Sequence, residues 1–534
     1  MKPIWSKILA VILAMAFALV MAACGSDDKA VAGATTETGV TADASPTTTN
    51  TEMFTDRDLD PSYDEATSID LSKEKSSTVS ITEAGTYVLS GTYDGQIVVK
   101  VGEDDKVQLV LDGVTLTNSK SAAIYVPSGD KVFITLADGS KNTVSSSASF
   151  SSADAETGDN VDAAIWSRAT LVFNGSGSLE VDCDNGHGIV SKDDVKVTGG
   201  SITVNAKNKG IAGKDSIRVH DGTITITAGD DGFHTSNDED EDKGFIYVEG
   251  GTITISSGDD GMHAETDLTI AGGIIDITKS YEGLEGQDIL ISGGTIDIVA
   301  SDDGINASEG GSGSDNTNDF GFGRMGGGGG GDFADNQNAS LTISGGTIRM
   351  DAGGDGLDSN GTMTVTGGTT YVNGPTNGGN GAIDCDNATV SGGTVIAAGA
   401  SGMDINFGDG STQCSMLVEF DSTVSGGTTV TVTDSDGKTV LSYTPTKDFQ
   451  SIVISSSDLK TGETYTVTAG NQTQTVEMTD TIVGTGHPMG GGQGGPGGGM
   501  QGGHMPGMGG FGGQSGNMNG QAVPDAQSSA TAAV

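Results

Sequence analysis

The stretch Gly250-Gly251-Thr252-Ile253-Thr254-Ile255, followed by Asp259-Asp260-Gly261-Met262, contains the two short signals that decide the fold. The first signal is a Gly-Gly pair, usually followed by Thr or Ser and then a β-branched residue. Its second Gly falls at 200, 251, 273, 294, 346, 368 and 393, and Asp221-Gly222-Thr223-Ile224 is a variant with Gly222 at the same place. The second signal is an acidic pair, a Gly and an apolar residue. Its Gly, or the Gly at the same place in other units, falls at 188, 210, 232, 261, 283, 304, 356, 381 and 402. The common step is close to 22 residues, and a fixed period of this size is typical of a solenoid.

The runs between these signals predict strands. In Thr252–Ile255 and Leu268–Ile270, polar and β-branched residues alternate, as they do in a strand with one buried face. No stretch shows helical periodicity, and Gly and Asp stand where the chain must turn. We therefore expect an all-β protein, a parallel β-helix with about 22 residues per coil. A leucine-rich repeat is the structural alternative, but its Leu-Asn signature is missing.

The charge of the chain restricts its partners. The formal net charge is −47 over 534 residues, of which 87 are Gly and two are Trp. Nucleic acid is excluded as a natural partner, because phosphate would be repelled. The charge instead favours bound cations, or neutral polymers that are contacted through their hydroxyl groups.

The N-terminal residues resemble a bacterial lipoprotein signal. Lys2 and Lys7 form a basic start, Ile8–Met21 is apolar, and Ala22-Ala23-Cys24 places small residues before a Cys. In such signals the Cys is acylated, so we expect Cys24 to become the lipidated N-terminus of an extracellular protein anchored to the bacterial cell membrane. A transmembrane helix would need a longer apolar run. A soluble secreted form with ordinary cleavage is the stronger alternative.

Changes in composition divide the chain into five segments. In order, we expect a signal peptide at 1–24, a disordered tether at 25–71, the β-helix at 72–410, a small β module at 411–480 and a disordered Gly- and Met-rich tail at 481–534. The β-helix begins with longer apolar runs that we interpret as its first coils and a cap. The tail contains Met and His residues that could hold copper, although a tail without a site is the alternative.

Two insertions interrupt the period. Thr235–Gly244 contains five successive acidic residues and predicts an extended turn, either a local cation site or a solvated acidic loop. Residues 308–338 predict a disordered Gly-rich loop. After removal of the signal, Cys183, Cys385 and Cys414 remain. We expect buried free thiols, with a bridge between Cys385 and Cys414 as the alternative.

Three parts of the chain together resemble a bacterial carbohydrate-binding domain family that was long described as a domain of unknown function. They are Leu109–Leu136, the repeats described above and the segment Gly427–Tyr443, with a turn at Ser435–Lys438. The resemblance covers roughly Val79–Thr479. It implies a right-handed parallel β-helix similar to that of pectate lyases, calcium along the helix, and binding to plant cell-wall polysaccharides without established catalysis.

The repeats place acidic residues in columns, because equivalent side chains of successive coils stack about 4.8 Å apart. At that spacing two carboxylates repel by about 0.9 kcal/mol in bulk water and by more near a protein surface. Either raised pKa values or bound cations must relieve this repulsion, and dense oxygen ligands suit Ca²⁺. The alternative is that each Asp only shapes a turn with its Gly. The candidate calcium ligands are Asp230, Asp231, Asp259, Asp260, Glu265, Glu282, Glu285, Asp302, Asp303, Asp355 and Asp358.

Two other columns lie among the same repeats. His234 and His263 are one coil apart and predict either hydrogen-bonded side chains beside the acidic column or a zinc or catalytic pair. Arg168, Lys192 and Lys214 follow one another in earlier coils. Such a basic column could pair with uronate carboxylates, or it could balance the acidic turns. Trp166 could stack on a sugar ring or fill the core.

Three functions remain open. The first is a monomeric, calcium-stabilised protein that binds polysaccharide, either pectin (polygalacturonate) or cellulose. The second is a lyase of pectate-lyase type, which needs calcium on the substrate carboxylate and a base, commonly Arg, beside it. The third is an adhesin or spacer. The Arg residues are Arg57, Arg168, Arg218, Arg324 and Arg349. None lies beside the densest acidic cluster in sequence register, which favours binding over catalysis.

Overall fold

The computed structural model describes residues 53–150, 158–308, 338–385, 387–484 and 486. The chain separates into two units, Met1–Thr51 and Glu52–Val534, and every described residue belongs to the second. The predictions for the signal peptide and Cys24, and most of those for the Gly-rich loop and the tail, lie outside the described residues. Among the helices of the described part, none has the length and apolar character that crossing a membrane requires.

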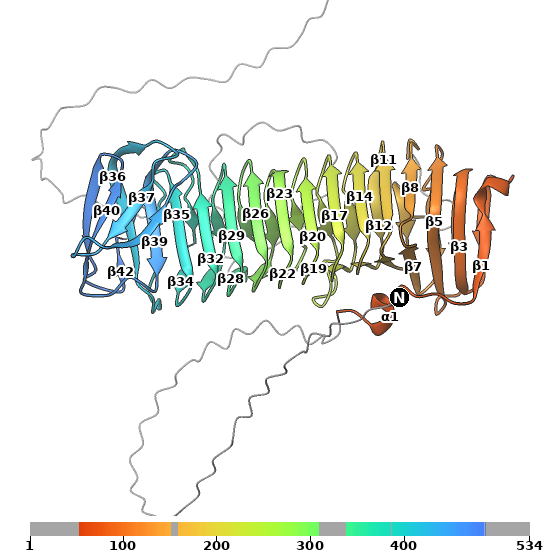
Figure 1. Ribbon diagram of the computed structural model, residues 1–534, viewed down its shortest axis with the longest axis horizontal. Coiled ribbons are helices and arrows are strands. Elements are labelled where there is room, and N and C mark those ends of the chain that lie inside the picture. Colours follow the sequence, from red (N-terminus) through yellow and green to blue (C-terminus); the bar gives the residue numbers. More distant parts are fainter. Residues whose placement is uncertain (1–52, 151–157, 309–337, 386, 485, 487–534) are drawn as a thin grey trace, which may run out of the picture. The chain divides into compact units, whose positions relative to one another are not determined.

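The described unit is all-β, and its strands form three ladders in which each strand pairs in parallel with its counterpart one repeat later. Figure 1 shows the strands following one another in chain order, from red to blue. Parallel pairing of this kind is what the 22-residue repeat predicts, since identical short runs meet one repeat apart.

The first ladder consists of β2 (Thr78–Ile81), β4 (Gln96–Lys100), β6 (Ile124–Ser128), β9 (Ala163–Ser167), β12 (His187–Ser191), β15 (Ile211–Gly213), β18 (Phe233–Thr235), β21 (Met262–His263), β24 (Leu284–Gly286), β27 (Ile305–Ala307), β30 (Leu357–Ser359) and β33 (Ile383–Asp384). The second ladder consists of β1 (Ala66–Asp70), β3 (Gly85–Asp94), β5 (Lys106–Asn118), β7 (Lys131–Leu136), β10 (Thr170–Gly175), β13 (Asp194–Val197), β16 (Ser216–Val219), β19 (Phe245–Val248), β22 (Asp267–Ile270), β25 (Asp288–Ile291), β28 (Ser340–Ile343), β31 (Thr362–Val365) and β34 (Asn387–Val390). The third ladder starts on the second half of β5 and continues through β8 (Lys141–Ser146), β11 (Ser178–Cys183), β14 (Ser201–Ala206), β17 (Thr223–Ala228), β20 (Thr252–Ser256), β23 (Ile274–Ser280), β26 (Thr295–Ala300), β29 (Thr347–Ala352), β32 (Thr369–Asn373) and β35 (Thr394–Gly399).

The core lies between the ladders and is built from columns of like side chains. In the third ladder, Ile224 is in register with Ile202 on one side and with Ile253 on the other, and all three are buried. Fully burying one Ile side chain stabilises the fold by about 1.5–3 kcal/mol. Because each residue of the column repeats this gain, the alternating Thr-Ile-Thr-Ile runs hold the ladder in one register.

The two glycine signals have different physical causes. Gly251 has φ +83°, a conformation that L side chains rarely adopt, so it permits the turn that enters β20. A Cβ on Gly261 would lie 2.5 Å from the carbonyl oxygen of Gly283 in the next repeat. Gly at this second place is therefore required by the close stacking of successive repeats.

A small β module closes the C-terminal end, as predicted, although its first sheet continues the third ladder. β35 pairs with β39 (Phe449–Ser456) in antiparallel orientation, and β39 pairs with β36 (Ser415–Val424), which in turn pairs with β42 (Ile482–Val483). A separate four-stranded antiparallel sheet consists of β37 (Val430–Thr433), β38 (Thr439–Tyr443), β40 (Thr464–Ala469) and β41 (Gln472–Glu477). The predicted turn at Ser435–Lys438 joins β37 and β38, and the module has its own apolar core.

The prediction of a disordered tether is wrong for residues 53–71. These residues contain the short helix α1 (Asp56–Leu59) and strand β1, and the 3₁₀ turn η1 (Leu71–Lys73) begins at their end. Thr55 and Asp58 form a capping box, in which each side chain accepts the backbone N–H of the other residue. Polar composition suggested disorder, but Asp58 is fully buried against the second ladder. The prediction of buried free thiols is confirmed for Cys183, Cys385 and Cys414.

Candidate functional site

The acidic side chains are positioned by the first ladder. Phe233 is in register with Met262, and Met262 with Leu284, so the residues two positions earlier also follow one another: Asp231, Asp260 and Glu282. The same pairing continues the column through Asp303 and Asp355. On the other side of the Gly, His234, His263, Glu285, Asn306 and Asp358 form a second column.

Carboxylates of the first column bind the backbone of the following repeat. Asp231 accepts the N–H of Asp260 at 3.2 Å, and Asp260 accepts that of Glu282 at 3.3 Å. Further along, Asp303 accepts the N–H of Asp355 at 2.6 Å. These bonds satisfy turn amides that would otherwise be unpaired. They give the acidic residues a structural role between repeats, in addition to the turn-forming role that Asp before Gly usually has.

One end of the column contains its own counter-ion, Lys209. Its Nζ lies 2.8 Å from Oδ2 of Asp231 and 3.5 Å from Oδ2 of Asp230. Burial alone would raise the pKa of Asp231, but the hydrogen bond with His234 and the charge of Lys209 hold it well below its usual range. Asp259 completes this group, since ligand atoms of Asp230, Asp231 and Asp259 lie within 4.8 Å of one another. Lys209 therefore supplies one positive charge to the cluster of Asp230, Asp231 and Asp259.

In the next repeat, His263 pairs with the carboxylates of Asp260 and Glu285. Its Nδ1 lies 3.2 Å from Oδ2 of Asp260 and 2.5 Å from Oε2 of Glu285. Burial opposes protonation of the ring, but the hydrogen bonds to both carboxylates raise the pKa of His263 to about 10. The ring is thus cationic at neutral pH. The same contacts lower the pKa of Glu285 against the effect of burial.

His234 behaves differently from its neighbour in the stack. The two ring centroids are 4.9 Å apart, and Nδ1 of His234 lies 2.8 Å from Oδ2 of Asp231. Burial and the charges of Lys209 and His263 lower the pKa of His234. The structure therefore presents two histidines that are hydrogen-bonded to the acidic column, one neutral and one cationic. This agrees with the prediction that His234 and His263 are hydrogen-bonded side chains beside the acidic column.

Beyond His263 the carboxylates repel one another. Burial and neighbouring carboxylates raise the pKa of Glu282 to about 8, of Asp303 to about 6, and of Asp355 to about 7. Asp358 is shifted to about 8 by burial and by the charges of Asp303, Asp384 and Asp355. Hydrogen bonds to Asn306 and to backbone amides relieve only part of this repulsion. This end of the column, which we call the downstream acids, is Glu282, Asp303, Asp355, Asp358 and Asp384.

Asp384 was missed by the sequence prediction. Ile383 is in register with Leu357, so Asp384 lies beside Asp358. Counting two residues from Gly381, the Gly used as the repeat marker, gives Ile383 instead. In the structure Ala382 takes the place of that Gly, and the register is displaced by one residue. The signal that could have found Asp384 is the apolar residue before it, because the inward-facing positions preserve the register.

The remaining predicted calcium ligands and the acidic insertion lie outside these clusters. Tyr281 makes a side-chain hydrogen bond with Asp302, and this contact raises the pKa of the phenol to about 12. Glu265 lies two residues after His263. Like the downstream acids, it belongs to neither of the two groups of acidic and histidine side chains whose ligand atoms converge in the described residues. The acidic residues 238–242 are exposed, which favours the solvated-loop alternative for this insertion.

The basic column lies at the ends of earlier strands of the same ladder. Arg168, Lys192 and Lys214 directly follow β9, β12 and β15, and Ser236 takes the same place after β18. The N–H of Lys192 binds the carbonyl of Ser167, and the N–H of Ser236 binds the carbonyl of Lys214. The three basic side chains line one open hollow of about 620 Å³ with Asp159 and Ser236.

The charges of this hollow are partly paired. Nε of Arg168 lies 2.6 Å from Oδ2 of Asp159, and Nζ of Lys214 lies 3.5 Å from Oε2 of Glu239. Glu239 is 79% exposed and Lys214 is 37% exposed, so solvent weakens the second pair. Lys192 is exposed beside them. The column therefore presents accessible cations on a strongly acidic protein.

Trp166 does not take part in this surface. Its side chain is completely buried in a small apolar cluster with Val190, and its ring lies 5.6 Å from that of Tyr125. The prediction that Trp166 stacks on a sugar is wrong in this structure, and its core alternative holds. Trp166 lies outside the main core, but neighbouring side chains cover it. The repeat period alone does not reveal this covering.

Comparison with known proteins finds similarity over part of the chain. Residues 75–317 match the family model described as carbohydrate-binding domain-containing protein. A carbohydrate-binding domain-containing protein of Acetivibrio thermocellus is 45% identical over 129 residues, which are 24% of this chain and 45% of that relative. The chain thus spans less than half the length of that curated relative.

A solved structure described as a polysaccharide lyase-like protein from C. thermocellum, in a gadolinium derivative, is 35% identical to this chain. The match covers 43% of this chain and 92% of that one, with a TM-score of 0.37. The matched residues 75–317 contain the basic column and four of the five residues of each acidic column.

Proposed function

We propose that this protein binds acidic polysaccharide, such as polygalacturonate, through the hollow lined by Arg168, Lys192 and Lys214. The observation that carries the proposal is the placement of three cations in successive repeats along one open hollow. Successive repeats are about 4.8 Å apart, so the cations form a straight row suited to a polymer with regularly spaced carboxylates. Arg and Lys bind carboxylates by charge-assisted hydrogen bonds. Cellulose, which has no charge, would gain nothing from this row.

The test is binding of soluble polygalacturonate to the double variant Lys192→Glu with Lys214→Glu. We expect binding to weaken by at least tenfold, because two attractive contacts become repulsive. The control carries the same charge change at two exposed lysines outside the hollow, Lys120→Glu with Lys141→Glu. Equal binding by the two double variants would show that net charge alone matters, and the hollow would then not be the site.

We further propose that calcium is held by the downstream acids. Carboxylate oxygens are ligands that calcium prefers. Burial and neighbouring carboxylates raise the pKa values of Asp303, Asp355 and Asp358, so a bound cation would relieve their repulsion. Asp230, Asp231 and Asp259 fit less well, since Lys209 already supplies their cation. A bound calcium ion would supply the charge that keeps these acids ionised, and this chain's residues would provide the ligands and stack the repeats.

Calorimetric titration of chelator-treated protein with CaCl₂ tests this assignment. Asp358→Asn should weaken the binding of calcium at least tenfold, whereas Asp238→Asn, in the exposed acidic loop, should leave it unchanged. Equal affinities would place any calcium elsewhere.

Several finer properties belong to the same proposal. The ladders support a right-handed parallel β-helix, the Cys24 signal supports a lipid-anchored extracellular protein, and we propose that the protein is a monomer that does not cleave its ligand. Lyase chemistry is the second candidate, because the relative of known structure is described as lyase-like. Appearance of unsaturated uronides during incubation with polygalacturonate and calcium would favour that candidate over binding alone.

A further inference from the structure

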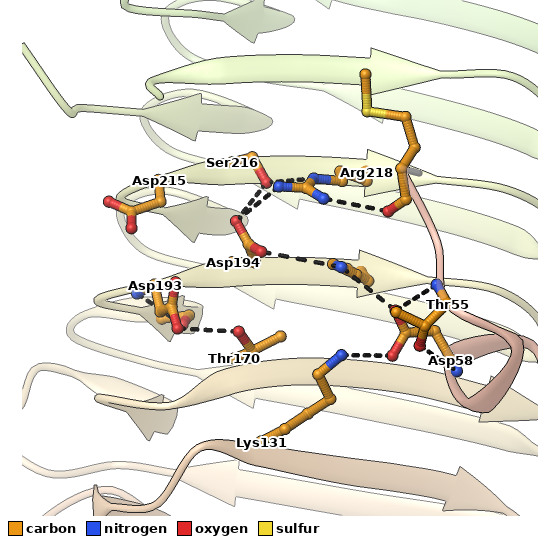
Figure 2. A network of polar contacts seen from close by, with 12 residues as sticks. Thr55, Asp58, Lys131, Thr170, Asp193, Asp194, Asp215, Ser216 and Arg218 are labelled. Atoms are coloured by element: carbon orange, nitrogen blue, oxygen red, sulfur yellow. Dashed lines mark hydrogen bonds and ion pairs between the residues drawn. The ribbon is translucent and has the colours of Figure 1, made fainter. Parts of the chain in front are cut away.

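The segment Met53–Asp60 lies against the second ladder, and the strand residues that its side chains bind lie 51 or more residues later in the chain. Figure 2 shows Asp58, beside Thr55, joined to Lys131 on one strand, with Arg218 on another strand joined to Ser216 and Asp194. The contacts of Asp58 with Lys131 and Lys196 span 73 and 138 residues of sequence. The repeat period does not relate these residues, so the contact is a separate feature of the fold.

Asp58 is held as a bound carboxylate would be. Its side chain is fully buried, with Oδ1 2.6 Å from Nζ of Lys131 and Oδ2 3.3 Å from Nζ of Lys196. Its backbone carbonyl accepts hydrogen bonds from the hydroxyl of Thr198 at 2.8 Å and from Nδ2 of Asn174 at 3.4 Å. Three strands or their ends, β7, β10 and β13, thus supply four donors to one residue of the segment.

Arg218 extends the site by one repeat. Lys196 is in register with Arg218, whose Nη1 donates to the carbonyl oxygen of Met53 at 3.1 Å. Nη2 of Arg218 lies 3.3 Å from Oδ1 of Asp194. Lys196 and Arg218 are both at least nine-tenths buried. We call Lys131, Lys196 and Arg218 the strap site, and Met53–Asp60 the strap.

The charge of the strap site depends on the strap. Lys131, Lys196 and Arg218 face two carboxylates, Asp58 and Asp194, in the structure. Without Asp58, three cations would face one carboxylate on a chain whose net charge is −47. Because Lys196 and Arg218 are buried, loss of Asp58 would leave positive charge without its partner, which favours binding of another anion.

The strap is held mainly by polar contacts. Asp58 is the only buried residue of α1, and Leu59 beside it is 42% exposed. Arg57 adds a contact over the ring of Phe133 and a hydrogen bond to Gln108 at 2.7 Å. A segment that buries so little apolar surface gains little from the hydrophobic effect and can leave its site without unfolding the ladder.

We propose that the strap is an intramolecular ligand, and that its release opens the strap site to the carboxylates of an acidic polysaccharide. The strap site lies on the second ladder and is distinct from the hollow after the first ladder. This proposal rests on the proposed function in one respect, the class of ligand, which is an acidic polysaccharide. The strap and the polysaccharide would compete for the strap site. If the site is open in only a small fraction of molecules, its apparent affinity for the polysaccharide is reduced in proportion to that fraction.

The experiment uses the full chain with Lys192→Glu and Lys214→Glu, so that the hollow does not contribute. Into this background we introduce Asp58→Asn and, as the matched control, Asp60→Asn. The control removes the same charge from the same segment at an exposed residue whose side chain accepts the N–H of Ser62. The probe is an oligogalacturonate, titrated calorimetrically at low salt. We expect Asp58→Asn to bind it at least tenfold more tightly than Asp60→Asn, and Lys196→Met to abolish that gain.

A second pair of measurements covers the case in which Asp58→Asn does not fold. Thr198→Val removes one donor to the strap and leaves the charges of the strap site intact, so it should raise binding in the same direction. A synthetic peptide of residues 52–61 should then compete with the oligogalacturonate, and the same peptide with Asn at position 58 should not. Unchanged oligogalacturonate binding in Asp58→Asn and Thr198→Val, with lower melting temperatures, would assign the strap a purely structural role and overturn the proposal. If Lys192→Glu with Lys214→Glu binds polygalacturonate no more weakly than its control, the proposed function is overturned but the strap proposal is not.

Discussion

Replacing Lys209 with Met removes the ammonium group that neutralises Asp230 and Asp231. Nζ lies 2.8 Å from Asp231, whose side chain is 4% exposed, and the side chain of Lys209 is 23% exposed. Removing one partner of a buried ion pair costs about 3–5 kcal/mol, because the other charge is left buried and uncompensated. Since part of the Lys209 side chain reaches solvent, we expect a loss at or below the lower end of this range, about 2–3 kcal/mol.

Urea denaturation at neutral pH in chelator measures this loss. Lys207→Met is the matched control, since Lys207 is exposed two residues earlier, and a surface change of this kind should remain within about 0.5 kcal/mol. Calcium should then restore stability to Lys209→Met, because a divalent cation can take the place of the ammonium between Asp230, Asp231 and Asp259. At a hundredfold excess over its Kd, a ligand of the folded state adds about 2.7 kcal/mol.

Two results would refute this reasoning. If Lys209→Met loses no more stability than Lys207→Met, the ion pair contributes nothing and the column does not need a cation. If the loss is present but calcium raises the stability of Lys209→Met and of the parent chain equally, the cluster does not accept calcium in place of Lys209.

Three further predictions concern the core, the stacking and the titration of a buried phenol. Trp166→Ala should lower the free energy of unfolding by about 3–5 kcal/mol, whereas Trp166→Phe should cost far less and polysaccharide binding by the folded variant should be unchanged. Gly261→Ala should lower it by about 3 kcal/mol, measured by urea denaturation, because the new methyl group would lie 2.5 Å from the carbonyl oxygen of Gly283. Burial and the Glu249 carboxylate, which accepts the phenol's hydrogen bond at 2.9 Å, raise the pKa of Tyr247 to about 12. Because the unfolded value is about 10, the folded chain retains this proton longer, and stability is lost as the pH rises from about 10 to about 12. Ultraviolet titration should show a late tyrosine step that shrinks in Tyr247→Phe.

The periodic part of the fold could be predicted from the sequence, because its determinants are local. Each repeat meets only its neighbours, so the spacing of Gly-Gly-Thr-Ile and Asp-Asp-Gly specifies strands, turns and the stacking of Asp231 on Asp260. The same logic located the basic column of Arg168, Lys192 and Lys214, which the structure brings together in one hollow. Where an insertion displaced the register, as at Gly381, the count failed and Asp384 was missed.

The tertiary structure decided which charges are paired and which positions are covered. Lys209 could be aligned with the acidic column, but only the structure shows its ammonium within 2.8 Å of Asp231. Neighbouring side chains bury Trp166, and Asp58 forms ion pairs with Lys131 and Lys196. The repeat period does not predict these contacts. A repeat fixes the relation between neighbouring strands, whereas packing of a non-repeating segment onto them depends on shape and charge complementarity that sequence spacing does not encode.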